Sequence, residues 1–177
     1  MSEVLPIIQL GNAILRQPAT AIESVHDSAI AALIENLVAT LQESNGVGIA
    51  APQVAVSKRL FIVASRPNPR YPHAPEMEPT PMINPRLVSH SDEVAKDWEG
   101  CLSIPGIRGL IPRYRAIEVE YINAHGQLQR QELTDFVARI FQHELDHLDG
   151  IVFLDRLDSV QEIITDQEYL KLMQKQN

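Results

Sequence analysis

Hydrophobic residues recur at helical spacing in one early segment of the chain. Between residues 27 and 44, apolar side chains stand three or four positions apart, so they share one face of an α-helix. These residues are Ile30, Leu33, Ile34, Leu37, Val38 and Leu41. Asp27 or Ser28 is a suitable N-cap, and Asn45-Gly46 is a typical helix stop. The pattern therefore predicts a helix over residues 27–44.

Shorter apolar runs predict strands. Residues 60–63 form a continuous apolar run, which is typical of a short buried strand. Residues 82–88 predict a second strand, which we place at a sheet edge because Pro85 has no N–H to donate to a neighbour. Residues 115–122 alternate between apolar and polar positions, and we expect them to pair with residues 127–133 across the intervening turn.

The last third of the chain has two further helical patterns. The first begins at Thr134 or Asp135, either of which can cap a helix, and it places Glu144 beside an apolar stripe. The second covers roughly residues 159–174, within a C-terminal helical segment 159–177. The sequence therefore predicts an N-terminal, a central and a C-terminal helix.

Residues 65–81 hold six of the twelve prolines and predict an extended surface loop. Each flank of this loop is too short to bury a core of its own, so we do not expect the loop to join two domains. The elements together predict a single α+β domain over residues 1–177. Small, mostly antiparallel sheets should pack around the central helix, together with the N-terminal and C-terminal helices.

Composition narrows the classes of partner. The chain has 177 residues, of which 45% are hydrophobic and 21% charged, as is ordinary for a globular protein. A formal net charge of −8 argues against nucleic acid or an anionic membrane surface as the main partner. The N-terminus lacks the features of a signal peptide, and no stretch approaches the roughly 20 apolar residues of a membrane span. We expect a cytoplasmic protein, with a mature organellar form as the alternative.

The strongest chemical signal lies in the predicted central helix. His143 and His147 stand four positions apart, with Glu144 next to the first. On a helix, two imidazoles at this spacing can bind one metal ion, and the glutamate can reach a water molecule on that metal. The motif therefore favours metal-assisted hydrolysis. Two ordinary surface histidines are the alternative, but the neighbouring Phe141 and Leu148 indicate that part of this turn is buried.

The motif does not identify a third metal ligand. The segment after His147 contains no histidine, and its acidic residues follow no ligand pattern. The only cysteine, Cys101, excludes an intramolecular disulfide. A lone cysteine is commonly a small buried apolar residue, but a nearby divalent metal would favour its thiolate as a ligand. Asp146 and Asp149 are candidate hydrogen-bond acceptors for the imidazole N–H groups.

Three segments together resemble the signature motifs of the peptide deformylase family, in the family's order. They are Gly46-Val47-Gly48-Ile49-Ala50-Ala51-Pro52-Gln53, Glu99-Gly100-Cys101-Leu102-Ser103 and Gln142-His143-Glu144-Leu145-Asp146-His147. The similarity extends from Gln9 to about Leu157. The resemblance implies removal of the formyl group from the N-terminal formylmethionine of nascent polypeptides, with release of formate.

The resemblance also assigns roles to residues. The implied ligands of one divalent metal ion are Cys101, His143 and His147. Family members use Fe(II) natively, and Zn, Ni or Co can occupy the site, since mixed nitrogen and sulfur ligands suit several metals. Glu144 would act as general acid and base on the metal-bound water. The Gln53 side chain and the Leu102 backbone N–H would stabilise negative charge on the formyl oxygen.

N-formylmethionyl peptides are the implied partners. The family's peptide lies extended, as an added strand, and the matching positions here are Val47, Gly48 and Gly100. Small residues there allow close approach of two backbones. An apolar pocket for the methionine side chain would be lined by Phe136, Ile140 and Ile49.

Some residues depart from the family pattern. Asp97, followed by Trp98, stands where the best-studied bacterial members have an aliphatic residue, which predicts a more polar pocket rim and leaves side-chain preference open. The tail from Asp158 to Asn177 has four acidic residues against two lysines, so we expect weak ribosome association through it. We expect a monomer rather than an oligomer.

Three alternatives remain open from the sequence. A zincin-like metallopeptidase would cleave internal peptide bonds. A non-enzymatic, metal-stabilised binding protein would need a closed site, usually with four protein ligands, and no second cysteine exists to close one. A deformylase-like protein with altered substrate choice is the third.

Overall fold

Strand β2 (Leu60–Ser65) lies in the middle of the fold and contains the predicted buried run. Its first four side chains have no exposed surface. The first and third of them pack in the hydrophobic cluster of helix α1 (Ser28–Ser44), whereas the second and fourth pack in the cluster of helix α2 (Asp135–Leu148). A strand covered on both faces needs apolar residues at every position, so this prediction is confirmed.

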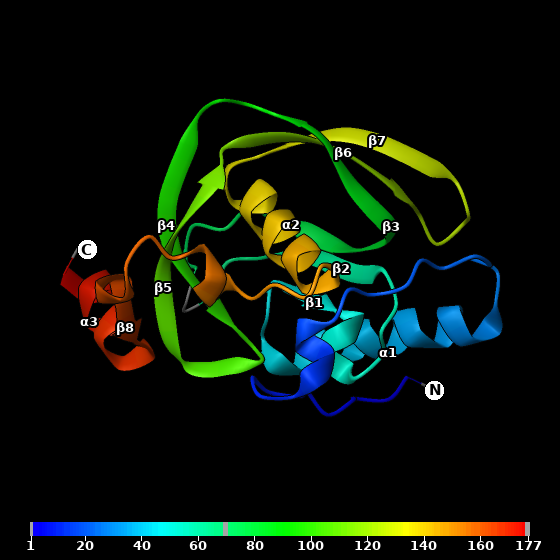
Figure 1. Cartoon of the computed structure of the whole chain (residues 1–177), viewed down its shortest axis with the longest axis horizontal. Helices are drawn as coiled ribbons and strands as arrows, with labels where there is room; N and C mark the ends of the chain where they lie inside the picture. The colour runs from blue at the N-terminus through cyan, green and yellow to red at the C-terminus, as the bar shows by residue number, and fades with distance from the viewer. Residues whose placement is uncertain (1, 69–70, 176–177) are drawn as a thin grey trace.

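The structure is a computed structural model that describes residues 2–68 and 71–175. The strands of this part form two antiparallel sheets, ordered β1-β2-β3-β6-β7 and β4-β5-β8 (Figure 1). The other strands are β1 (Gly48–Ala50), β3 (Met77–His90), β4 (Val94–Cys101), β5 (Ile104–Tyr114), β6 (Ala116–Ile122), β7 (Leu128–Thr134) and β8 (Ile163–Thr165). The other helices are α3 (Asp166–Lys175) and the short 3-10 helices η1 (Ala13–Arg16), η2 (Ala51–Val54), η3 (Phe153–Arg156) and η4 (Val160–Glu162).

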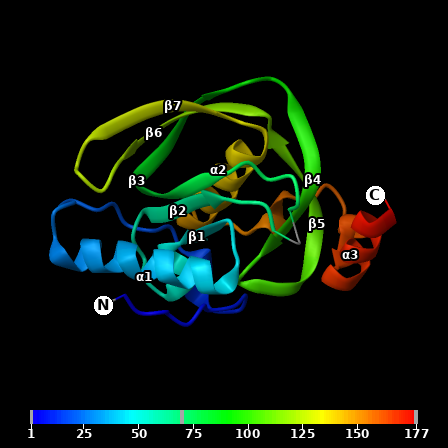
Figure 2. The ribbon, with the colours of Figure 1, turned by 180° about the vertical axis from the view of Figure 1, so that it is seen from behind.

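Helices and sheets alternate in layers. Helix α1 covers one face of the five-stranded sheet, and helix α2 packs on the opposite face (Figures 1 and 2). The β4–β5 hairpin curves past the other side of α2, so this helix lies between the two sheets. The predicted α+β fold around a central helix is confirmed. None of the helices described is both long enough and apolar enough to cross a membrane.

Strand β3 corrects two predictions about the proline-rich region. The sequence predicts a loop over residues 65–81, but β3 begins at Met77, so the last part of that range is a strand. The strand predicted at 82–88 is not at an edge, because β3 lies between β2 and β6. Pro85 is tolerated there for two reasons. It lies at a bulge in the pairing of β3 with β6, and it lies beyond the residues of β3 that pair with β2.

The C-terminal segment also differs from its prediction. Helix α3 covers only residues 166–175, whereas residues 163–165 form strand β8 against β5. The run Ile163-Ile164-Thr165 consists of β-branched residues, which favour a strand when a sheet edge is available. The last two residues of the predicted segment 159–177 lie outside the described part.

The ends of α1 and the β6–β7 hairpin agree with the sequence, whereas the expected side-chain cap of α2 is not formed. The Asp27 side chain accepts a hydrogen bond from the Ala29 N–H at 2.9 Å, and Asn45 ends α1 in the left-handed region with φ of 52°. Helix α2 starts after Thr134, whose side chain makes no capping hydrogen bond. Strands β6 and β7 form the predicted antiparallel pair.

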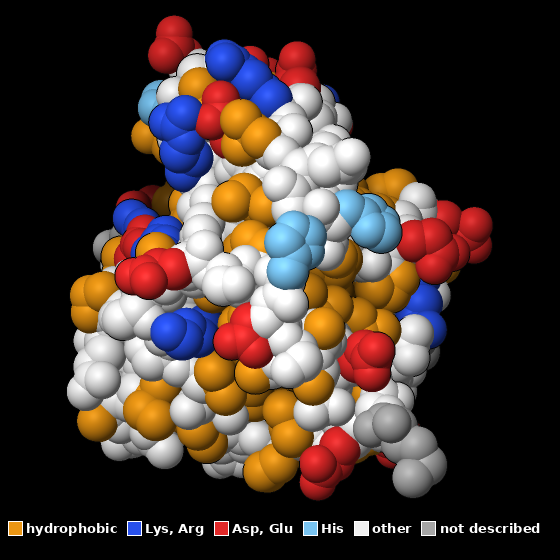
Figure 3. All heavy atoms as spheres, turned by 90° about the vertical axis from the view of Figure 1, so that its right-hand side faces the viewer, with side chains coloured by type: hydrophobic (Ala, Val, Ile, Leu, Met, Phe, Trp, Pro, Cys, Tyr) orange, Lys and Arg blue, Asp and Glu red, His pale blue; other side chains and the backbone are white. Residues whose placement is uncertain are grey.

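Charged side chains of both signs are mixed on one face of the molecule. On the face shown in Figure 3, the described Lys and Arg side chains are interspersed with Asp, Glu and hydrophobic side chains. Nucleic-acid-binding surfaces instead gather cations into a continuous patch. The mixed surface of this face agrees with the net charge of −8.

Candidate active site

Helix α2 and the end of strand β4 bring three potential metal ligands together. His143 and His147 lie on one side of α2, and Cys101 is the last residue of β4. The ligand atoms of these three side chains all lie within 4.8 Å of one another. Cys101 Sγ and His147 Nε2 are 3.3 Å apart. The fold therefore joins residues that stand more than forty positions apart in the sequence.

Glu99 orients the first histidine. The Nδ1 atom of His143 lies 2.9 Å from Glu99 Oε2, which leaves its Nε2 atom for the ligand cluster. Burial disfavours the ionised form of Glu99, but Arg113 and His143 outweigh it and hold the pKa of this carboxyl well below its usual range. Burial also holds the pKa of His147 well below its ordinary value, so this imidazole stays neutral, as a metal ligand must.

A buried ion network surrounds Glu99. Arg113 donates to both carboxylate oxygens of Glu99, at 2.9 and 3.1 Å, and to Asp146 Oδ2 at 2.6 Å. Arg139 Nη1 donates to Glu99 Oε1 at 2.9 Å. Asp146 therefore binds arginine rather than an imidazole, and Asp149 binds an arginine of the neighbouring loop. The expectation that these two aspartates accept from the histidines is wrong: Glu99 of β4 is the partner of His143, and the Nδ1 atom of His147 has no hydrogen-bond partner within the described chain.

Glu144 lies beside the ligand cluster and faces strand β1. It is 4% exposed, and within the described chain its Oε2 atom has no hydrogen-bond partner. A Cβ atom at Gly48 would overlap the Glu144 carboxylate, so only glycine allows this approach. Burial raises the pKa of Glu144 to about 7, which is a suitable value for proton transfer near neutral pH.

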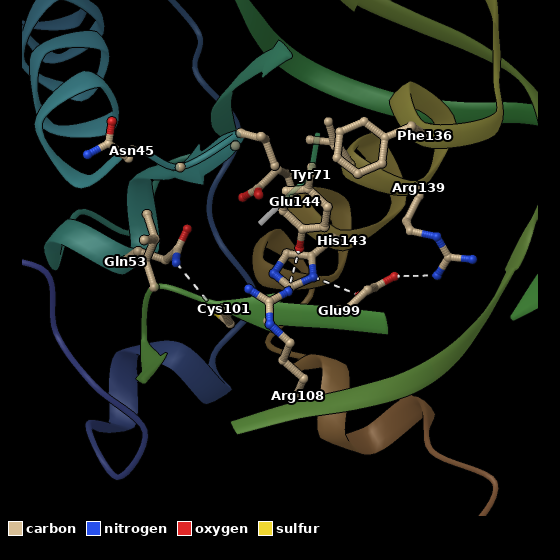
Figure 4. A pocket seen from close by; sticks show the side chains of 16 residues that line it. Asn45, Gln53, Tyr71, Glu99, Cys101, Arg108, Phe136, Arg139, His143 and Glu144 are labelled. Atoms are coloured by element: carbon tan, nitrogen blue, oxygen red, sulfur yellow. Dashed lines mark hydrogen bonds and ion pairs between the residues drawn. The ribbon is translucent and has the colours of Figure 1, made fainter. Parts of the chain in front are cut away.

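Gln53 is held firmly at the other side of the cysteine. Its Oε1 atom accepts from the Ala50 N–H at 2.8 Å, and this bond turns the amide nitrogen toward Cys101. The Nε2 atom then lies 3.6 Å from Cys101 Sγ (Figure 4). It also lies 3.2 Å from Ser103 Oγ. The residue is 1% exposed, so Gln53 belongs to the buried part of the site and is not an ordinary surface amide.

One pocket collects most of the predicted residues. Its lining includes the predicted catalytic and peptide-binding positions Gln53, Leu102, Glu144, Val47, Gly48 and Gly100. Phe136 and Ile140 also line it, as predicted, but Ile49 does not, because it is fully buried in the cluster beneath α1. Asp97 and Trp98 are not among the lining residues, so the polar groups that line this pocket come from other positions.

Other residues give the pocket its polar wall. Tyr71 from the proline-rich segment, Arg108 from β5 and Arg139 from α2 all line it (Figure 4). The Tyr71 ring packs on the Phe136 ring, with centroids 4.8 Å apart. Sequence patterns give no signal for these residues, because their side chains meet only after the β4–β5 hairpin and the proline-rich segment fold over α2.

The donor set fits a divalent metal ion. A thiolate and two imidazoles make three protein ligands, which leaves an open position of the kind that catalytic sites keep. The unpartnered carboxylate oxygen of Glu144 is buried in the same pocket. The neutral His147 presents a nitrogen lone pair. Burial opposes the charged form of His143, but Cys101 and Glu99 outweigh it and raise the pKa of this imidazole well above its ordinary value, so a metal ion would bind there by displacing a proton. The mixed set of sulfur and nitrogen ligands is compatible with several transition metals.

A family model and a similar protein of known sequence both match nearly the whole chain. The family model of polypeptide deformylase matches residues 4–162. A protein of Nostoc sp. named peptide deformylase 2 is 66% identical over 173 residues, which cover 98% of this chain and 97% of that protein.

Solved structures agree with this result. A class I type b peptide deformylase from Acinetobacter baumannii, with Met-Ala-Ser bound, has a TM-score of 0.87 and 45% identity, covering 89% of this chain and 100% of that chain. A peptide deformylase from Thermotoga maritima has a TM-score of 0.80 and 34% identity, covering 89% and 99%. By sequence and by structure, this chain belongs to the polypeptide deformylase family.

Proposed function

We propose that this chain carries out its peptide deformylase activity in the pocket between β1, β4 and α2. The enzyme hydrolyses the formyl group from the N-terminal formylmethionine of nascent polypeptides and releases formate. The observation that carries the proposal is the convergence of Cys101, His143 and His147 next to the buried carboxylate of Glu144. The metallopeptidase and binding-protein alternatives are set aside, because family membership extends over residues 4–162.

Cys101, His143 and His147 would hold one divalent ion, with Fe(II) as the expected native metal and Zn, Ni or Co as possible occupants. When bound, the ion supplies Lewis acidity, which makes water nucleophilic near neutral pH and polarises the formyl carbonyl. Glu144 takes a proton from the attacking water and passes a proton to the amine of the departing peptide. Its pKa of about 7 matches a group that must both accept and donate.

Gln53 and Leu102 would stabilise the negative charge that develops on the formyl oxygen. The Gln53 amide nitrogen is aimed at the cysteine side of the pocket by its bond to Ala50. Leu102 follows Cys101 directly, and its backbone N–H is the second donor. Donors fixed before the reaction stabilise the transition state without reorganising, and one donor typically contributes about 2.7–4 kcal/mol.

The peptide would bind as an extended strand between two sheet edges. Strand β1 ends the first sheet and strand β4 ends the second, and both border the pocket. Val47 and Gly48 on one side and Gly100 on the other would then form main-chain hydrogen bonds to the peptide. Recognition through the main chain explains acceptance of many nascent sequences, while Phe136 and Ile140 would contact the methionine side chain.

The proposal places the protein in the compartment of protein synthesis, which in bacteria is the cytoplasm. We expect a monomer with weak ribosome association. The described tail from Asp158 to Lys175 carries four acidic residues against two lysines, which is the wrong charge balance for contact with rRNA phosphates.

The direct test combines metal analysis with a formate-release assay. Protein loaded with a divalent metal should release formate from formyl-Met peptides and leave the internal bonds of unformylated peptides intact. Removal of the metal by a chelator should abolish turnover, and metal addition should restore it. Formate release unaffected by complete metal removal would contradict the assignment of the three ligands.

A further inference from the structure

Arg108 is a buried cation in the wall of the substrate pocket. It lies on strand β5, is 2% exposed and lines the pocket. Its guanidinium packs against Gly100, where an added Cβ atom would lie 3.3 Å from the guanidinium carbon. Burying a guanidinium is costly unless its donors are paired, so the position of this group depends on its partners.

Two of these partners come from the C-terminal helix α3. Arg108 Nε donates to Asp166 Oδ1 at 2.8 Å, and the guanidinium carbon lies 4.3 Å from the centroid of the Tyr169 ring. Strand β8, directly before α3, pairs with β5 so that Ile164 stands opposite Arg108. The C-terminal segment therefore makes three contacts with Arg108: β8 pairs with its backbone, Asp166 pairs with its charge, and the Tyr169 ring covers one face of its guanidinium.

The third partner comes from the proline-rich segment. Arg108 Nη1 donates to the Tyr71 hydroxyl at 3.0 Å (Figure 4). Tyr71 in turn packs on Phe136 of helix α2. A continuous series of contacts thus runs from α3 through Arg108 to Tyr71 and Phe136, and the last three of these line the pocket.

We propose that Asp166 and Tyr169 of helix α3 are positioning residues for substrate binding. They fix the Arg108 guanidinium against Gly100 and under Tyr71, and thereby set the shape of the pocket wall. The contacts of this series, as described, do not involve the proposed metal ligands Cys101, His143 and His147 or the carboxylate of Glu144. Loss of the α3 contacts should therefore weaken peptide binding more than it slows the chemical step. The inference rests on the peptide occupying this pocket.

The test compares Asp166→Ala and Tyr169→Leu with the wild-type enzyme, all loaded with the same metal. For a formyl-Met tripeptide, KM should rise about tenfold in Asp166→Ala, as expected from loss of one charge-assisted hydrogen bond, while kcat stays within about twofold. The dissociation constant of the product peptide Met-Ala-Ser should rise by a similar factor, which measures binding without turnover. Asp166→Glu, which keeps the carboxylate, should restore most of the affinity.

Glu168→Ala is the matched control. It removes an exposed carboxylate of the same helix whose ion pair, within the described residues, is with Lys171 at the surface, so KM should not change. A purely stabilising role for α3 would lower the melting temperature of Asp166→Ala and leave KM and the Met-Ala-Ser affinity at wild-type values, and that result would overturn the proposal. Absence of formate release from the wild-type enzyme would instead contradict the proposed function.

Discussion

At the scale of single residues, the site depends on the close approach of Gly48 and Glu144. The two residues are far apart in the sequence, and the carboxylate occupies the space where any other residue at position 48 would place its Cβ atom. The glycine is thus required by packing against a catalytic group. The main-chain contact with the peptide that we propose for Gly48 would be an additional requirement on the same residue.

Gly48→Ala should lower kcat by about 10²-fold, because the new methyl group displaces the carboxylate by a distance that proton transfer does not tolerate. Metal content should stay at the wild-type value, since the atoms nearest to an added methyl group at Gly48 belong to Glu144 and not to Cys101, His143 or His147. The measurement is formate release together with metal analysis. A variant with normal kcat would contradict the requirement for glycine.

Glu99 is the residue on which the orientation of His143 depends. Glu99→Gln removes the ionised acceptor, and we expect metal affinity to fall by about 10–100-fold, as is usual when such a partner of a ligating histidine is lost. Competition with a chelator measures this. Asp146→Asn is the control, because it disturbs the same arginine network without touching a ligand nitrogen. Equal losses of metal affinity in both variants would show that the network acts only through stability.

At the scale of elements, helix η3 joins the end of the metal-binding helix to the N-terminal segment. The Asp155 carboxylate accepts from the Val152 N–H at 2.9 Å and forms an ion pair with Arg16 of η1. Burial opposes ionisation of Asp155, but these partners outweigh it, so the pKa of this carboxyl lies below its ordinary value. The Asp155 carboxylate thus links η3 to Arg16 of η1.

Asp155→Asn should destabilise the protein at pH 7 by less than about 1 kcal/mol, since the pair is partly exposed and screened by solvent. Because the folded-state pKa is lowered, this contribution is present above the unfolded pKa of about 3.9 and is lost as the pH falls through the folded value. Urea unfolding of both proteins between pH 7 and about pH 3 should therefore show a difference that shrinks below about pH 4. A difference that grows at acid pH would contradict the sign.

At the scale of the whole molecule, the proposed substrate pocket lies between the edge strands of two separate sheets. Strand β1 belongs to one sheet and strand β4 to the other, and helix α2 between them carries the histidines and Glu144. An added peptide strand would join the two sheets. The C-terminal segment completes the second sheet through β8, so its structural role is separate from any contact with the ribosome.

The lysines of α3 should contribute little to ribosome binding. Lys171→Glu combined with Lys175→Glu keeps β8 and the Arg108 contacts, whereas deletion of residues 159–177 would remove both. Cosedimentation with ribosomes at low salt should be the same for the double variant and the wild type, because no net basic surface is lost. A marked fall in cosedimentation would show that these lysines contact rRNA.

The sequence by itself determined the features that depend on local spacing. Helix 27–44, the buried run 60–63 and the pair His143–His147 follow from periodicity and cap chemistry, and each is present in the structure. The resemblance to the family added Cys101 and Gln53, whose types and order are written in the chain.

Only the tertiary structure decided which distant groups meet. Glu99, rather than Asp146, binds His143 because the β4–β5 hairpin brings its carboxylate to that face of α2. Pro85 lies in an inner strand because the partners of β3 change along its length, and residues 163–165 form a strand because β5 offers an edge. Pairing between segments far apart in the chain depends on packing that no local pattern encodes, so the polar wall of Tyr71, Arg108 and Arg139 became visible only in the folded molecule.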